Sequence, residues 1–350
     1  MPDTGERSYA YAKACGIIGK SFVGKRVRDL EKASRLSELD RMVFSDSAKS
    51  LPEKELLRDL EKRIINREVN SIISIVECFS KPPEFFTLLI RSYEYADLLS
   101  AINASWEKER NAPAHVDIGR FQTVRFEAWP DIPKMVEGTA FKSLLEKLEK
   151  AGTDKGGISE KQNFALQSLL DQHYYGALWN ALLSLPAGDR QAAKKILSNE
   201  ISLKNSSWAL RLRTFYQMPP EEVKLHLVDV PDGKNPLGKN SHFLAKDALA
   251  CLDYQLDSYS DWASWRWKEF LNSPFEGRHW QADPRFFQNA ASRYLYNLAR
   301  HHFRLNPSSL DTVFCFIKLK QFEEDVLTSS AEGLGIGMSV KDTISMLGVE

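Results

Sequence analysis

Net charge and long apolar runs are both missing from this 350-residue sequence. Lys and Arg together number 47 and Asp and Glu also number 47, so no global positive field is available to attract nucleic acid. No apolar run approaches the roughly 20 residues that a helix needs to cross a bilayer. Charged residues occupy the start with no apolar stretch behind them, which predicts no signal peptide. We therefore expect no nucleic-acid partner and no direct membrane span.

Cysteine is also scarce, and common catalytic and metal-binding sequence motifs are absent. The four cysteines lie far apart, which excludes a CxxC metal or redox motif and predicts reduced, mostly buried thiols in a cytosolic protein: Cys15, Cys78, Cys251 and Cys315. No HExxH or GxSxG sequence occurs, and the adjacent His301 and His302 would point in different directions on a helix. We assign no catalytic, cofactor-binding or metal-binding residue.

Strand patterns are sparse, so the sequence predicts an all-α fold. The exception is the stretch 111–133, which holds three prolines, Gly119 and the β-rich piece FQTVRFEAW. We interpret it as a connection between helical units that can hold a short extended segment. The stretch 229–240 is the clearest loop and a candidate boundary.

One stretch, 199–227, has the pattern of two helices that meet at a sharp corner. Apolar residues recur up to Phe215, and Pro219 and Pro220 then end the first helix, because a residue before proline is pushed out of the α region. Proline is tolerated in the first turn of a helix, and the next residues, Glu221 and Glu222, suit the positive end of its dipole.

A similar pattern of helix, break and helix recurs at 317–347. Glycines at 333, 335 and 337 are expected to break the first helix, and Ser339 with Asp342 has the spacing of a capping box for the second. A weaker copy covers 91–103. Units of this kind about a hundred residues apart predict an internal triplication.

The strongest competing motif is a relaxed P-loop at 14–21, ACGIIGKS, which would use Gly19, Lys20 and Ser21 to bind a nucleotide. The overlapping repeat of the GxxxxGK spacing ends at Arg26, where a Ser or Thr would hold magnesium. A P-loop also needs an apolar strand before it and a helix after it. The residues before it are typical of a small-residue helix, so tight helix packing is the simpler interpretation.

Two further patterns have simple structural interpretations. Trp262, Trp265 and Trp267 lie beside basic residues, as in surfaces that stack on bases, but balanced charge favours an aromatic core. The charged run 53–67 is typical of a solvated helix face.

Several segments, spread over nearly the whole chain, resemble the C subunit of V/A-type rotary ATPases, called subunit d in eukaryotes. They are YAYAKA at 9–14, RSYEYADLLSAI at 91–102, LLDQHYYGALWNAL at 169–182, EISLKNSSWALRLR at 200–213 and PSSLDTVFCFIKLKQFEEDV at 307–326. That family carries a loose motif in each of three repeats: an acid, two residues, an asparagine and a leucine. Here Glu94, Asp97 and Leu98 occupy these positions in the first repeat, with Asp in place of Asn. In the second they are Ser202, Asn205 and Ser206, where serines replace the acid and the leucine. In the third they are Glu323, Val326 and Leu327, with Val in place of Asn.

The resemblance implies three similar helical domains arranged as a funnel, which we place at 1–113, 114–235 and 236–350. It also implies a non-catalytic central-stalk subunit without cofactors. Such a subunit is a socket between the central shaft subunits and the membrane rotor ring. It would lie peripherally at the cytoplasmic face and couple ATP turnover or synthesis to proton or sodium transport. The alternatives are a P-loop nucleotide-binding protein, which a nucleotide-binding assay would reveal, and a generic helical-repeat adaptor, which would not be encoded beside ATPase subunits.

Overall fold

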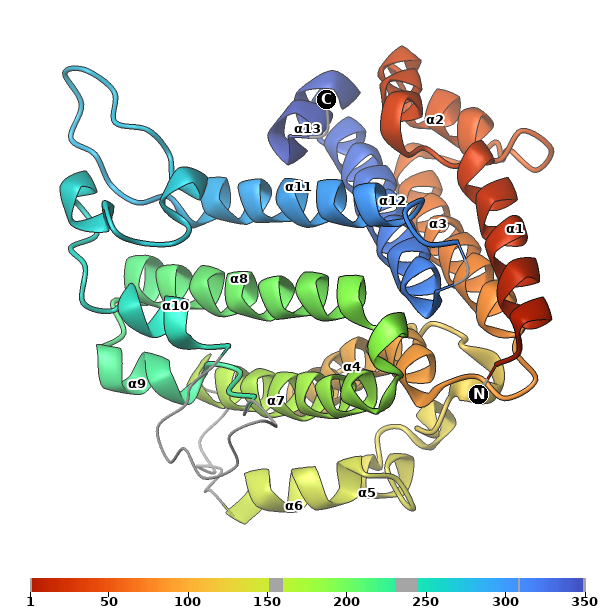
Figure 1. The fold of residues 1–350 in the computed structure, drawn as a ribbon, viewed down its shortest axis with the longest axis horizontal. Coiled ribbons are helices and arrows are strands. Elements are labelled where there is room, and N and C mark those ends of the chain that lie inside the picture. Colours follow the sequence, from red (N-terminus) through yellow and green to blue (C-terminus); the bar gives the residue numbers. More distant parts are fainter. Residues whose placement is uncertain (1, 151–159, 231–243, 308, 349–350) are drawn as a thin grey trace. The chain divides into compact units, whose positions relative to one another are not determined.

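The computed structural model describes residues 2–150, 160–230, 244–307 and 309–348, and throughout them the fold is helical without a strand (Figure 1). This confirms the all-α prediction. The α-helices are α1 Thr4–Lys20, α2 Leu36–Val43, α3 Glu53–Val76, α4 Glu84–Trp106, α5 Ile132–Met135, α6 Phe141–Lys150, α7 Glu160–Ser184, α8 Gln191–Tyr216, α9 Pro220–Leu225, α10 Lys246–Ala250, α11 Pro284–His302, α12 Leu310–Gly335 and α13 Val340–Leu347. Among the described helices none is long and apolar enough to cross a membrane.

Contacts divide the chain into two compact units, each assembled from separate stretches of sequence. Unit 1 consists of residues 1–86, 185–196 and 288–350, and unit 2 of residues 87–184 and 197–287. The threefold division at 1–113, 114–235 and 236–350 stays a prediction, as do the triplication and the funnel.

Helix α12 is the centre of unit 1. Its residues are buried on almost every side, from Leu310 to Leu334, because other elements surround the helix. It packs lengthwise against α3 and also contacts α1, α2 and α13. Asp311 in its first turn accepts hydrogen bonds from the backbone N–H groups of Ala192 and Ala193, which begin α8.

The glycines near the end of α12 act differently from the prediction. The helix continues through Gly333 to Gly335, so the predicted break at these two residues is wrong. A Cβ on Gly333 would lie 2.5 Å from Thr343 Oγ1, and one on Gly335 would lie 3.0 Å from Leu57. These glycines therefore let α13 and α3 approach α12 closely. The turn itself uses Gly337, whose φ of 82° favours glycine. Ser339 then caps α13 by accepting the N–H of Asp342, as predicted.

In unit 2, α7 contacts both α4 and α8 through aromatic side chains. The Tyr95 and Tyr174 rings join α4 to α7, with centroids 5.1 Å apart, and Phe164 on α7 packs edge-on against Trp208 on α8. The three tryptophans 262, 265 and 267 are at most 4% exposed, which confirms the aromatic core.

The corner after α8 is confirmed, whereas the weaker copy at 91–103 contains no break. Helix α8 ends at Tyr216 and α9 begins at Pro220. By contrast, 91–103 lies wholly inside α4, because no proline or glycine interrupts it.

Candidate functional site

The P-loop-like residues form the last turn of a helix and not a loop before one. Gly19 and Lys20 end α1, and Ser21 is its C-cap. A phosphate-binding loop presents free N–H groups at a helix N-terminus, whereas a C-terminus presents carbonyl groups. The Ser21 hydroxyl is already used, because it donates to Ile17 O at 3.1 Å and accepts from Lys320 Nζ at 3.0 Å.

We expect Lys20→Ala to change the free energy of unfolding by less than about 0.5 kcal/mol, because Lys20 is exposed and makes no ion pair within the described residues. Thermal or urea denaturation measures this. Isothermal titration with ATP supplies the second reading. A loss of nucleotide affinity on this substitution would contradict our interpretation of residues 14–21.

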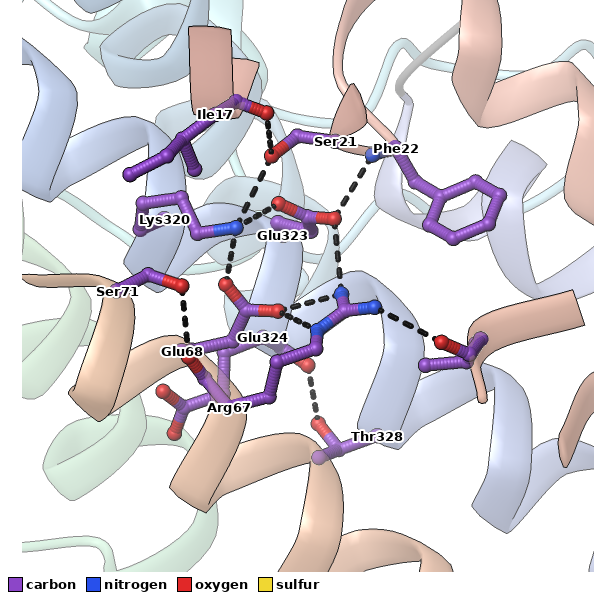
Figure 2. A network of polar contacts seen from close by, with 11 residues as sticks. Ile17, Ser21, Phe22, Arg67, Glu68, Ser71, Lys320, Glu323, Glu324 and Thr328 are labelled. Carbon is purple, nitrogen blue, oxygen red and sulfur yellow. Dashed lines mark hydrogen bonds and ion pairs between the residues drawn. The ribbon is translucent and has the colours of Figure 1, made fainter. Parts of the chain in front are cut away.

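The chemistry concentrated in unit 1 is a buried network of four charged side chains, the charge network (Figure 2). Arg67 and Glu68 come from α3, and Lys320 and Glu323 come from α12. Lys320 forms ion pairs with both Glu68 and Glu323, and Arg67 lies 2.5 Å from Glu68 Oε1 and 3.0 Å from Glu323 Oε1. Two positive and two negative charges therefore alternate in space and cancel.

The charge network joins three helices. Glu323 accepts the backbone N–H of Phe22 at 2.8 Å, and Lys320 donates to Ser21 (Figure 2). Ser21 and Phe22 both lie directly after α1. Lys320 is 2% exposed and both carboxylates are fully buried, so the network fastens α1 and α3 to the central α12 from within.

The surroundings shift the pKa values of the two carboxyl groups in opposite directions. Burial, and then the charge of Glu323, raise the pKa of Glu68, although Lys320 and Arg67 oppose the shift. Burial also acts to raise the pKa of Glu323, but the charges of Lys320 and Arg67 and the hydrogen bonds from Lys320 and Phe22 outweigh it and lower that pKa. Glu323 is therefore the member of the pair that ionises more readily.

Sequence reasoning missed most of the charge network. Of its members the sequence marks only Glu323, through the motif resemblance, and the charged run 53–67 predicts a solvated face. That interpretation is wrong for Arg63 and Arg67, whose side chains are 17% and 27% exposed and turn toward the buried carboxylates of Asp40 and Glu323. A usable signal is present: Lys320 and Glu323 are three residues apart, and each lies beside an apolar residue, Leu319 and Phe322, where unpaired charges would be costly.

Unit 2 contains a related arrangement at the first motif. Glu94 on α4 is 1% exposed. Its carboxylate accepts the backbone N–H groups of Thr123 and Val124 and the Thr123 hydroxyl. One turn later, Asp97 accepts the N–H of Val116 at 2.8 Å. These bonds hold the connection 111–133 onto α4.

No strand forms in the described connection 111–133, although its backbone is extended at Gln122. The described residues there form two short 3₁₀ helices, Gly119–Phe121 and Phe126–Ala128, followed by α5. Glu94 takes two of the backbone N–H groups that a strand would need for pairing. The connection therefore contains extended backbone but no paired strand.

The second motif anchors backbone through Asn205 on α8. Its amide accepts the N–H of Val228 at 2.7 Å and donates to Val228 O at 2.8 Å and to Leu244 O at 3.3 Å. Ser202, one turn earlier, donates to Asp247 Oδ2 at 2.6 Å. Polar side chains at the motif positions thus bind distant chain segments in both units.

The pKa of Asp97 is raised to about 6, first by burial and then by the charge of Glu94, against the lowering effects of Val116 N–H and His115. Its folded-state pKa lies above the unfolded value of about 3.9, so its contribution to stability is fully present below that value and is lost as pH rises through about 6. We expect Asp97→Asn to remove this loss, on the order of 1–3 kcal/mol, while keeping the acceptor for Val116. Denaturation of both proteins across this pH range measures it; parallel pH profiles would contradict the assignment.

Among the described residues no group of His, Cys, Asp and Glu has the arrangement of a metal site. Cys251 and Cys315 are buried, while Cys15 and Cys78 are half-buried, and all four are free. Burial raises the pKa of Cys251 to about 12, so this thiol stays protonated. In the part of the chain that the structure describes, His301 and His302 belong to no such group.

The motif positions, from Glu94 to Leu327, all lie within the part of the chain that matches a known family. A family model described as ATP synthase (C/AC39) subunit matches residues 39–344. An uncharacterized protein of Treponema pallidum (strain Nichols) is 29% identical to this chain over 329 residues, which are 94% of this chain and 92% of that protein. The family match extends through α3, α4, α8 and α12, the helices that carry the buried anchors.

Proposed function

Since this chain belongs to the ATP synthase (C/AC39) subunit family, we propose that it is the non-catalytic socket of a V/A-type rotary ATPase. In that role it seats the central shaft on the membrane rotor ring. It passes rotation between ATP turnover and the movement of protons or sodium ions. It binds through the ring at the inner face of the membrane and does not enter the bilayer.

The family match over residues 39–344 carries this proposal. The internal architecture supports it, because a part that transmits torque has to resist shear between its helices. Packed interiors transmit strain well. In unit 1 the charge network ties α3 and the end of α1 to α12, and in unit 2 Glu94 and Asn205 tie connections to long helices. Directional polar bonds of this kind fix register between packed elements.

A deletion experiment tests the proposal. Membrane vesicles from cells that lack this chain should keep ATP hydrolysis by the soluble head but lose ATP-driven ion uptake. Re-expression of the chain should restore uptake, and an empty vector serves as the control. The proposal fails if ion uptake remains fully coupled to hydrolysis without the chain, or if the purified chain binds neither the shaft subunits nor the detergent-solubilised ring.

A further inference from the structure

A concentration of positive charge lies on unit 1, where α11 passes the 3₁₀ helix η1 (Gly24–Lys32). The two segments are in contact, because the Gly24 N–H donates to the buried Tyr296 hydroxyl at 2.6 Å. A Cβ on Gly24 would lie 3.8 Å from the Arg300 guanidinium, which also lies over the Tyr296 ring. The cations of α11 and η1 therefore belong to one surface.

The charge on these segments contrasts with the neutral chain. Residues 20–35 contain six Lys or Arg and two Asp or Glu, and residues 288–304 contain three Arg and no acid. We define the basic patch as the exposed cations on the two packed segments: Lys25, Arg28, Arg293, Arg300 and Arg304. In the described part of the chain none of these five has a carboxylate partner, whereas their neighbours Arg26 and Lys32 both pair with Asp29.

The basic patch has a regular geometry. At about 100° per residue, Arg293 and Arg300 fall within roughly 20° of one another around α11 and lie about 10 Å apart along its axis, and Arg304 follows in the turn after the helix ends at His302. Lys25 and Arg28 are three residues apart in a 3₁₀ helix, where such positions eclipse. Both rows rest on rigid elements, because Tyr296 is 5% exposed and its ring stacks on Phe322 of α12 with centroids 4.0 Å apart.

We propose that the basic patch is a docking surface for an acidic face of another rotor subunit, a protein surface that presents carboxylates along a helix or loop. This inference rests on the proposed function for the identity of that partner. Unpaired guanidinium groups favour carboxylates because the planar fork binds them in a bidentate manner. Charge complementarity of this kind fixes orientation and speeds association.

The geometry favours a protein over anionic lipid headgroups. A fluid lipid surface needs positive charge but no particular register, and clusters of flexible side chains satisfy it. Here four of the five cations are arginine, and two of them, Arg293 and Arg300, lie on the same side of a regular helix. A rotary joint requires a partner that binds such fixed charges in one register, because slippage between the two subunits would lose the coupling of rotation to ion transport.

The test compares two charge reversals of equal size in unit 1. Arg300→Glu with Arg304→Glu reverses the basic patch, and Lys54→Glu with Arg58→Glu reverses two exposed cations of α3 as the matched control. The probes are the purified shaft subunits, the detergent-solubilised rotor ring, and vesicles of phosphatidylcholine with phosphatidylserine. We expect the patch reversal to weaken binding to one rotor subunit at least about tenfold, with the control within about twofold. The neutral pair Arg300→Gln with Arg304→Gln should fall between them and covers the case in which the reversal disturbs folding.

Raising the salt concentration should weaken wild-type binding and have a smaller effect on the reversed variant, because added ions screen exposed charges. Equal binding of the patch variants and the wild type to both rotor probes would overturn the inference while leaving the socket function intact. The same holds if only vesicle binding is lost. Failure of the wild-type chain to bind either rotor probe would instead overturn the proposed function, and the inference with it.

Discussion

Replacing Lys320 with methionine should destabilise unit 1 by about 3–5 kcal/mol, because removal of one partner from a buried ion cluster leaves uncompensated charge. Lys320 is 2% exposed and pairs with both Glu68 and Glu323, so the substitution leaves two buried carboxylates with one guanidinium. Methionine has nearly the same length and keeps most of the apolar packing. Urea denaturation followed by circular dichroism measures the loss.

Two companion variants separate charge from packing. Lys318→Met lies on the same helix and is half-buried, so it should cost less than about 1 kcal/mol. Adding Glu68→Gln to Lys320→Met restores neutrality between Arg67 and Glu323 and should recover part of the stability, a coupling of about 1–3 kcal/mol. If the double variant were as unstable as the sum of the two single variants, the four charges would not act as one cluster.

Glu94→Ala should cost about 3 kcal/mol and release the connection 111–133 from α4, because it leaves the N–H groups of Thr123 and Val124 without an acceptor. Hydrogen exchange of a peptide that covers residues 119–128 should become faster than in the wild type. Stability of the whole protein is measured in parallel.

Glu94→Gln provides the matched control for that prediction. Its amide oxygen can still accept one of these hydrogen bonds, so the loss should be about half as large, since bonds to a charged acceptor are roughly twice as strong. Glu127→Ala removes an exposed carboxylate in the same connection and should leave exchange unchanged. Unaltered exchange in Glu94→Ala would show that packing of Phe121 and Phe126, and not the carboxylate, holds the connection.

Helix content, the corner at Pro219 and the tryptophan core were predictable because they depend on local rules. Proline stops a helix wherever it occurs, and apolar periodicity is visible in any window of the sequence. The same rules misjudged Gly333 and Gly335, because whether glycine ends a helix or admits a neighbour depends on what packs against it. Here the neighbours are Thr343 and Leu57.

The charge network was out of reach for a different reason. Its members lie on α3 and α12, and Arg67 and Glu323 are separated by 256 residues. A sequence pattern reports one helix face at a time, so it cannot show that two charged faces meet. The loose motif marked Glu94, Asn205 and Glu323 without revealing that each side chain binds backbone groups of another segment.

The bond between Glu323 and the N–H of Phe22 also determines how late during synthesis unit 1 can complete its core. These residues are 301 positions apart. At translation rates of about 5–20 residues per second, the ribosome adds that length in about 15–60 s. Between the synthesis of Val76, which ends α3, and that of Leu310, which begins α12, the apolar faces of α1 and α3 exist without the helix on which they pack. Unit 1 therefore completes its core only after α12 has been synthesised. Until then we expect chaperones to bind its first three helices.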